Sequence, residues 1–342
     1  MSGGLGLPNP ADVVATEDLS VAYEGQRRLL STGSPRPAVR GVSLRCARGE
    51  TLGIVGESGA GKSSVGRALL GLVPVTGGAV TVEGRRFTSM SSGDRKWIRR
   101  RVQIVYQDPY SSLNPSMVAA DIVGEVLRVN FGLKGNERRS RVRELFEQVG
   151  LSSYHLERYP YEFSGGQRQR IAIARALALE PSAIVCDEAV SALDVSTQAQ
   201  IINLLEHLQD AIGVGYLMIA HDLAVVRHMS HRIAVMFAGR IVEEGPAERV
   251  YSQPAHPYTQ ELLAAVPIPD PVEQRRRRAA RRKLLGTAAT ESAAIGSEQG
   301  CPFRGRCPYA MEVCSIEPPP WVAVDGGGAS ACHLDDRTAA LS

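Results

Sequence analysis

The strongest constraint on the fold of this chain is a glycine-rich stretch at residues 56–63, GESGAGKS, which fits the pattern G-x-x-x-x-G-K-[ST]. It directly follows the apolar run TLGIV at 51–55 and leads into the helical sequence SSVGRALLGL. Glycines allow a backbone to curl so that its N–H groups point at a polyphosphate, and the start of a helix adds the positive end of its dipole. A tight turn without a ligand is the alternative, but the order of strand, loop and helix favours a nucleotide-binding fold.

Short apolar runs alternate with helical patterns along most of the chain. Near-continuous apolar runs, which are typical of parallel strands covered on both faces, occur at 51–55, 102–106, 183–186, 215–220 and 233–238. Apolar residues at helical spacing predict helices over 137–149 and 197–212. Because strands and helices alternate, we predict an α/β protein.

Composition and charge exclude several classes of protein. The 342 residues carry 39 Lys and Arg against 36 Asp and Glu, and the net charge of +3 is too small for a dedicated nucleic-acid binder. No apolar run approaches the ~18 residues that a membrane-spanning helix requires. The first residues lack the basic-then-apolar order of a signal peptide, so we expect a cytoplasmic protein.

An acidic pair, Asp187 and Glu188, directly follows the apolar run at 183–186. A carboxylate at the carboxyl end of a parallel strand faces the same crevice as the glycine-rich loop. We expect Lys62 to reach the β- and γ-phosphates, and Ser63 and Asp187 to hold Mg²⁺. Glu188 is the candidate general base that polarises an attacking water. The pair alone is a weak signal, but beside the loop it predicts nucleotide hydrolysis.

A second helix start follows the sequence FSGGQ at 163–167. Ser164, Gly165 and Gly166 are typical of a helix N-terminus that binds an anion. One chain rarely needs two such termini for a single γ-phosphate. We therefore expect this one to serve the nucleotide of another subunit.

Taken in order, these motifs resemble the nucleotide-binding domain of ABC transporters. The resemblance rests on GESGAGKS, VYQDP, FSGGQ, IVCDE, SALD and IAHD, and it covers roughly residues 12–265. It implies a P-loop NTPase fold over 1–266, with a RecA-like core, an antiparallel β subdomain and an α-helical signature subdomain at about 108–170. It also implies a head-to-tail dimer that sandwiches two ATP molecules.

The resemblance assigns roles to four further residues. Gln107 in VYQDP would sense Mg²⁺ and the lytic water and couple to the membrane subunits. Asp194 in SALD would reach across the dimer, and His221 in IAHD would contact the γ-phosphate. Tyr23 is the candidate for stacking on adenine, and an ordinary strand tyrosine is the alternative.

The motifs and the resemblance together predict one site. Catalysis is assigned to Lys62, Gln107, Glu188 and His221, and Mg²⁺ to Ser63, Gln107 and Asp187. The predicted nucleotide-binding residues are Tyr23, Gly56, Glu57, Ser58, Gly59, Ala60, Gly61, Lys62, Ser63, Ser64, Gln107, Ser164, Gly165, Gly166, Gln167, Asp187 and Asp194.

A finer resemblance is to the ATPase subunits of oligopeptide and dipeptide importers and their nickel-type relatives. It rests on YQDPYSSLNP, on AHPYTQELLAAVP at 255–267 and on the tail sequence GCPFRGRCPYAMEVC. Two positions depart from the family pattern: Ala189 stands where proline is usual, and Phe163 where leucine is usual. Neither change removes a functional group.

The finer resemblance implies a set of partners and a location. These are a second ATPase subunit, identical or different, two membrane permease subunits and, indirectly, an extracytoplasmic solute-binding protein, with no nucleic acid. The chain would lie at the cytoplasmic face of the cell membrane. The alternatives are import of nickel or another small solute, a soluble ABC ATPase without transport, and a regulatory partner with a degenerate site.

The last part of the chain departs from the α/β pattern. Residues 267–300 contain the run QRRRRAARRK and predict a linker, either solvated or in contact with anionic headgroups. Cys301, Cys307, Cys314 and Cys332 lie in the tail 301–342. Because a cytosolic compartment disfavours disulfides, these thiols predict a metal site, a [4Fe–4S] cluster before zinc, with free or disulfide-bonded thiols as the alternative. The cluster assignment comes from the family resemblance.

Overall fold

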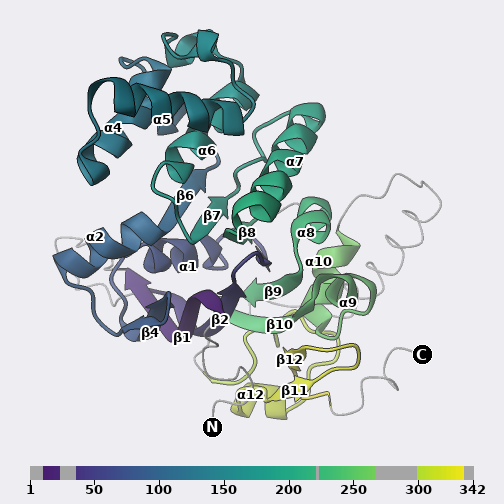
Figure 1. The fold of residues 1–342 in the computed structure, drawn as a ribbon. Coiled ribbons are helices and arrows are strands. Elements are labelled where there is room, and N and C mark those ends of the chain that lie inside the picture. The colour runs from purple at the N-terminus through teal and green to yellow at the C-terminus, as the bar shows by residue number, and fades with distance from the viewer. Residues whose placement is uncertain (1–10, 24–35, 221–222, 266–298, 335–342) are drawn as a thin grey trace, which may run out of the picture.

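The computed structural model describes residues 11–23, 36–220, 223–265 and 299–334. Its strands are β1 (Asp12–Tyr23), β2 (Arg36–Ala47), β3 (Thr51–Val55), β4 (Gly77–Val82), β5 (Arg85–Phe87), β6 (Val102–Tyr106), β7 (Ala183–Asp187), β8 (Gly215–Ile219), β9 (Arg232–Phe237), β10 (Arg240–Pro246), β11 (Trp321–Ala323) and β12 (Ala329–Ala331). Its helices are α1 (Lys62–Leu69), α2 (Ser92–Arg101), α3 (Pro109–Ser112), α4 (Ala119–Phe131), α5 (Gly135–Gln148), η1 (Ser153–His155), η2 (Pro160–Glu162), α6 (Gly165–Leu177), α7 (Val195–Ile212), α8 (Leu223–Met229), α9 (Ala247–Ser252), α10 (Pro257–Ala264) and α12 (Val313–Ile316). The prediction of an α/β protein is confirmed (Figure 1).

The central sheet has the strand order β11-β12-β10-β9-β3-β8-β7-β6. Strands β9, β3, β8, β7 and β6 run parallel, and these are the five strands that the apolar runs predict. The predicted helices also form, as α5 and α7, with shifts of one or two residues at their ends. The glycine-rich loop follows β3, which lies between the parallel strands β9 and β8.

Each face of the central sheet packs against its own hydrophobic core. Along β7, Ala183 and Val185 join the core with β1, β2, β4 and α1, whereas Ile184 and Cys186 join the core with α4 to α8. Because both faces are covered, every residue of β7 is buried, which explains the continuous apolar run. Cys186, like Cys46 in β2, is a fully buried core residue.

Two smaller units flank the sheet. Strands β2-β1-β4-β5 form an antiparallel sheet in which β1 pairs with both β2 and β4. Helices α4, α5 and α6 pack against one another at the end of the molecule opposite to β1 and β4 in Figure 1. The structure therefore contains the antiparallel and helical parts that the family resemblance implies.

The C-terminal segment corrects one prediction. Residues 299–334 do not form a separate cysteine-rich extension, because β12 pairs with β10 and β11 with β12, so that both strands belong to the edge of the central sheet. Cys301, Phe303 and Cys314 are buried in the core shared with α4 to α8. Most of the predicted linker, including its Arg-rich run, lies outside the described residues. Within the described ranges no helix is long and apolar enough to span a bilayer.

Candidate nucleotide site

The glycine-rich loop joins β3 to α1 and has a backbone that only glycine allows at two points. Gly56 and Gly61 have φ angles of 154° and 104°. A Cβ atom would lie 2.1 Å from the carbonyl oxygen of Met236 at Gly56, and 2.3 Å from that of Ala38 at Gly61. The loop is therefore held close to its neighbouring strands, with Gly61 as the N-cap of α1.

Lys62 begins α1 and lies against the backbone of the loop. Its Nζ donates hydrogen bonds to the carbonyl oxygens of Gly56, at 2.7 Å, and Glu57, at 2.9 Å. Burial lowers the pKa of Lys62, while the negative charges of Glu188 and Asp187 act in the opposite direction. The amine is thus a buried positive charge beside two carboxylates at the start of a helix.

Ser63 and Asp187, the two predicted Mg²⁺ ligands from the loop and from β7, are brought together. Ser63 Oγ donates a hydrogen bond to Asp187 Oδ1 at 2.8 Å. Gln107 directly follows β6, whose last residue, Tyr106, pairs with Asp187 in parallel register. A hydroxyl and a carboxylate are the oxygen ligands that Mg²⁺ prefers, so these side chains fit the predicted metal.

Glu188, the candidate general base, has a left-handed backbone conformation with φ of 54°. Its N–H donates to the carbonyl of Ile219 at 2.8 Å, and its own carbonyl accepts the hydroxyl of Ser191 at 3.0 Å. These bonds hold a conformation that costs a non-glycine residue about 1–3 kcal/mol. Such strain is typical of functional positions, and the carboxylate lies close enough to Lys62 to influence its pKa.

The residue after this base is held by a side chain that the sequence motifs did not indicate. Gln169 is fully buried in α6, and its Nε2 donates to the carbonyl of Ala189 at 2.6 Å. This hydrogen bond helps to hold the turn that follows Glu188. In the sequence, a polar glutamine among the alanines and isoleucines of α6 could have indicated this role.

The second helix start is α6, with Ser164 as its N-cap. Ser164 Oγ accepts from the N–H of Gln167 at 3.3 Å, and Gln167 Oε1 accepts from the N–H of Ser164 at 3.1 Å, which completes a capping box. A Cβ atom at Gly166 would lie 2.3 Å from Thr197 Cγ2. Glycine at this position therefore lets the start of α6 approach the start of α7.

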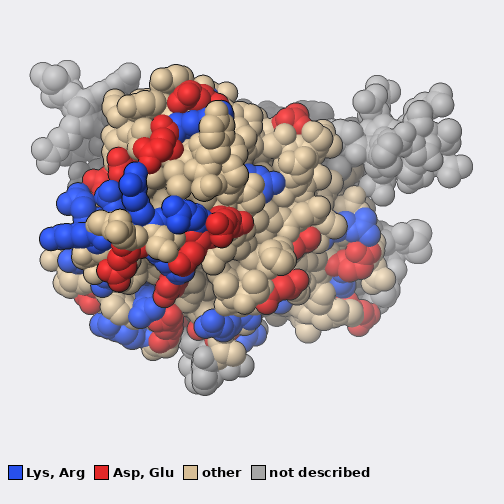
Figure 2. Space-filling view, turned by 45° about the horizontal axis from the view of Figure 1, so that its top comes forward, with Lys and Arg blue, Asp and Glu red and all other residues tan. Residues whose placement is uncertain are grey.

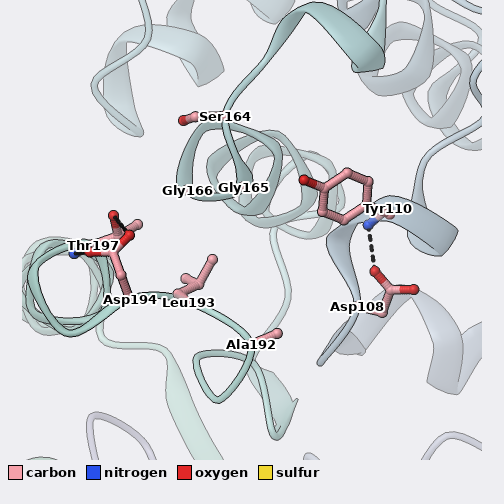
Figure 3. A pocket seen from close by; sticks show the side chains of 9 residues that line it. All are labelled: Asp108, Tyr110, Ser164, Gly165, Gly166, Ala192, Leu193, Asp194 and Thr197. Atoms are coloured by element: carbon pink, nitrogen blue, oxygen red, sulfur yellow. Dashed lines mark hydrogen bonds between the residues drawn. The ribbon is translucent and has the colours of Figure 1, made fainter.

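A pocket of about 180 Å³ lies between these two helix starts and the segment after β6. Figure 3 shows its lining residues, Asp108, Tyr110, Ser164, Gly165, Gly166, Ala192, Leu193, Asp194 and Thr197. It lies on the side of the FSGGQ sequence rather than at the glycine-rich loop. Sites for small-molecule ligands commonly have ~300–1,000 Å³, so this pocket holds only part of such a ligand.

Asp194 caps α7 and keeps its charge. Its Oδ1 accepts from the hydroxyl of Ser196 at 2.7 Å and from the N–H of Thr197 at 2.9 Å, and its Oδ2 accepts from the hydroxyl of Thr197 at 2.7 Å. These hydrogen bonds, first of all that from Ser196, hold the pKa of Asp194 well below its usual range.

The predicted nucleotide contacts of Tyr23 and His221 both stay predictions. The hydroxyl groups of Tyr23, at the end of β1, and Ser64, in α1, are 3.1 Å apart, so Tyr23 lies beside the helix that follows the glycine-rich loop. Its ring is partly exposed, and its stacking on adenine stays a prediction. His221 lies outside the described residues, just after β8.

The predicted metal cluster in the tail is not supported. Among the described residues no group of three or more His, Cys, Asp or Glu side chains is placed to hold a metal ion. Within the described ranges Cys301, Cys307, Cys314 and Cys332 form no disulfide, and burial raises the pKa of Cys301 and Cys307. We therefore assign no chemistry to these cysteines.

Comparisons with known proteins agree with this geometry. Residues 39–191 match the family model described as ABC transporter, and residues 242–314 match the model described as oligopeptide/dipeptide transporter, C-terminal region. The chain is 46% identical to the oligopeptide transport ATP-binding protein OppF of Salmonella typhimurium, over 87% of this chain and 89% of that protein. It is 43% identical to the di/tripeptide transport ATP-binding protein DppF of Pseudomonas aeruginosa, over 94% and 97%.

Solved structures show the same fold. CbiO1 of Clostridium perfringens, part of an ABC transporter complex, matches with a TM-score of 0.62 and 25% identity over 71% of this chain and 92% of that chain. A dimeric ATP-binding cassette bound to ADP and Pi matches with a TM-score of 0.60 and 29% identity over 68% and 98%. The chain therefore belongs to the ATP-binding proteins of ABC transporters, in the family that contains the oligopeptide and dipeptide transport ATPases.

Proposed function

We propose that the protein is the ATP-hydrolysing subunit that energises import of oligopeptides or dipeptides through an ABC transporter. One observation carries the hydrolytic part of the proposal. The amine of Lys62, the Ser63–Asp187 pair and the strained Glu188 lie close together at the carboxyl ends of β3 and β7. The peptide class rests on the relatives, which are named for peptide transport.

Each of these side chains has its own role in the proposed hydrolysis of ATP. The glycine-rich loop and the N-terminus of α1 bind the phosphates of ATP, and Lys62 stabilises negative charge on the γ-phosphate. Glu188 accepts the proton of the attacking water, a bond forms from this water to the γ-phosphorus, and the bond to the β–γ bridging oxygen breaks. Mg²⁺ held by Ser63 and Asp187 would neutralise charge on the phosphate oxygens. Gln107 and His221 are proposed to orient the water and the γ-phosphate.

A second ATPase subunit completes the site. The pocket around Ser164 and Asp194 is too small for a nucleotide. The N-terminus of α6, which lines it, is suited to an anion held by another chain. We propose a dimer, with an identical or a related subunit, in which the glycine-rich loop of one subunit faces Ser164 of the other. Two permease subunits and an extracytoplasmic solute-binding protein would complete the importer, with this chain at the cytoplasmic face of the membrane. Its ATPase domain would span 1–266.

Purification of the assembled complex in detergent tests this proposal. We expect two permease subunits to co-purify, and ATP turnover to rise when peptide and binding protein are added. A chain with Lys62→Ala is the matched control, because it keeps the fold of α1 but loses the phosphate-binding amine. Stimulation by nickel rather than peptide would favour the alternative cargo. A chain that binds nucleic acid in a salt-sensitive way and no permease would contradict the transport assignment.

A further inference from the structure

We infer that the C-terminal segment and α10 together position the glycine-rich loop, with Arg306 of the segment and Tyr258 of α10 as positioning residues that act on Glu57. The inference rests on the proposed ATP site and adds to it a source of control. Arg306 and Glu57 are 249 residues apart in the sequence, and Tyr258 and Glu57 are 201 apart. No motif in the sequence links these three residues, and the phosphate-binding loop is the element that they share.

The first contact is an ion pair at the loop. Arg306 Nη1 donates to Glu57 Oε2 at 2.9 Å, and Nη2 donates to Glu57 Oε1 at 2.8 Å, so the guanidinium binds both oxygens of the carboxylate. Nη2 also donates to Glu261 Oε1, in α10, at 2.6 Å. Bidentate pairs of this kind fix direction as well as distance, because both partners are planar.

The second contact is made by a buried tyrosine. The N–H of Glu57 donates to the hydroxyl oxygen of Tyr258 at 2.9 Å. Tyr258 is fully buried in α10, and this burial raises its pKa to about 12, so the phenol is neutral at physiological pH. An N–H at the beginning of the phosphate-binding loop is thus held by a rigid side chain from outside the loop.

The remaining polar group of Glu57 is its carbonyl, which accepts hydrogen bonds from the N–H of Ala60, at 3.2 Å, and from Lys62 Nζ, at 2.9 Å. The ammonium of Lys62 has three N–H donors, of which these bonds to Gly56 and Glu57 use two, so a phosphate competes with the carbonyl of Glu57 for the amine. The contacts from Arg306 and Tyr258 do not depend on that amine. They therefore keep residue 57 in place while Lys62 changes partner, which preorganises the loop.

Charge provides a second reason for the arrangement. The carboxylate of Glu57 lies close enough to Lys62 to act on its pKa, so it also lies near the place where a triphosphate binds. A negative charge there repels the nucleotide unless it is compensated. Arg306 supplies the compensating charge, and the ion pair raises the pKa of Arg306 further above its usual value.

The C-terminal segment is anchored firmly enough to transmit these contacts. Phe303 is 1% exposed and packs against three rings, with centroids 5.3 Å from Phe237, 5.5 Å from Tyr258 and 5.8 Å from His256. The guanidinium of Arg306 lies 5.6 Å from the centroid of Phe303. Phe237 ends β9, the parallel neighbour of β3, so the segment is packed on the strands that support the loop.

Equilibrium binding of a fluorescent ATP analogue to the full chain, together with steady-state kinetics, tests the inference. We expect Arg306→Ala to raise the Kd and KM for ATP about threefold to tenfold, with kcat changed less than about twofold. Tyr258→Phe keeps the ring packing and loses the acceptor for the N–H of Glu57, so it should raise the same two constants. In a Glu57→Gln background, the effect of Arg306→Ala should shrink to within about twofold, because no carboxylate is left uncompensated.

The matched control is Arg304→Ala, two residues away. Its side chain hydrogen-bonds the carbonyl of Gln299 within the same segment, and we expect unchanged nucleotide affinity. Thermal unfolding of each variant identifies any loss of folding, and Tyr258→Phe still tests the inference if Arg306→Ala does not fold. Wild-type affinity in both Arg306→Ala and Tyr258→Phe would overturn the inference, while the proposed function would stand. A wild-type chain that bound no ATP would contradict the proposed function instead.

Discussion

The starts of α1 and α6 are both suited to anions, but they differ in how their own chain treats them. At α1 the N-cap is Gly61, which has a left-handed backbone and offers no side-chain acceptor. At α6 the N-cap is Ser164, which forms a capping box with Gln167. The amides of α1 are therefore left for a ligand, whereas those of α6 are partly satisfied within the chain.

The side chains at the two helix starts also differ in how deeply they are buried. Lys62 and Asp187, at the glycine-rich loop, are only 6% and 9% exposed and lie among the parallel strands. Ser164 and Asp194 are exposed, and both line the pocket shown in Figure 3. On the face in Figure 2, Lys and Arg gather toward the left edge with Asp and Glu beside them, and neither sign covers the whole face. The difference supports the proposed arrangement, in which one side is complete within a chain and the other is completed by a partner.

The largest effect is expected on the complete side, from Glu188→Gln. The amide keeps the shape of the side chain but cannot take a proton from water, so turnover should fall about 10²–10⁴-fold. ATP affinity should change little, because Lys62 and the loop are untouched. Steady-state ATPase assays and nucleotide binding measure the two quantities separately.

A second glutamate provides the control for backbone strain. Glu180 also has a positive φ, of 51°, but it is exposed and pairs with Arg141 on the surface. Glu180→Gln should leave turnover unchanged. If Glu188→Gln hydrolysed ATP at the wild-type rate, Glu188 would not be the general base. The main contrast between the starts of α1 and α6 would then be lost.

A smaller effect is expected on the open side, from Ser164→Ala. Loss of the hydroxyl should reduce turnover about 10-fold to 100-fold, because a donor to the partner's nucleotide is removed. The ATP affinity of an isolated chain should not change, in contrast to Lys62→Ala. Loss of the N-cap should also lower the free energy of unfolding by about 1 kcal/mol.

Ser91 separates these two consequences. It caps α2 in a capping box with Asp94, outside the candidate site. Ser91→Ala should therefore cost a similar amount of stability without loss of turnover. If Ser164→Ala weakened ATP binding to the isolated chain, the open side would not be reserved for a partner.

Some parts of the fold and of the site could be predicted from the sequence, and others could not. The sequence predicted the parallel strands, and it predicted that the glycine-rich loop, Asp187 and Glu188 follow them. Both predictions depend on local signals, an apolar run and the polar residues directly after it. The place of the C-terminal segment was not, because β11 and β12 have three residues each and gain their position from pairing with β10. Gln169 and Arg306 were missed for a related reason: their roles depend on backbone carbonyls and carboxylates far away in the chain.

The smallest predicted effect concerns Asp194 and its dependence on pH. The hydrogen bonds from Ser196 and Thr197 hold the folded pKa of Asp194 below its unfolded value, so they stabilise the folded chain at pH values above the unfolded pKa. Asp194→Asn keeps an acceptor at the N-cap but loses the charge. The difference in unfolding free energy between wild type and variant should be constant near neutral pH and should shrink as the pH falls below about 4.

Denaturant unfolding at a series of pH values measures this difference. Asp94 is the matched control, since hydrogen bonds from Ser91 lower its pKa at the start of α2 in the same way. Asp94→Asn should show the same dependence on pH without any change in ATP turnover. A difference for Asp194→Asn that stayed constant through this range would show that the charge of Asp194 is not held by its own helix. In that case the carboxylate would be available to act across the proposed dimer, and the start of α7 would resemble that of α1 rather than that of α6.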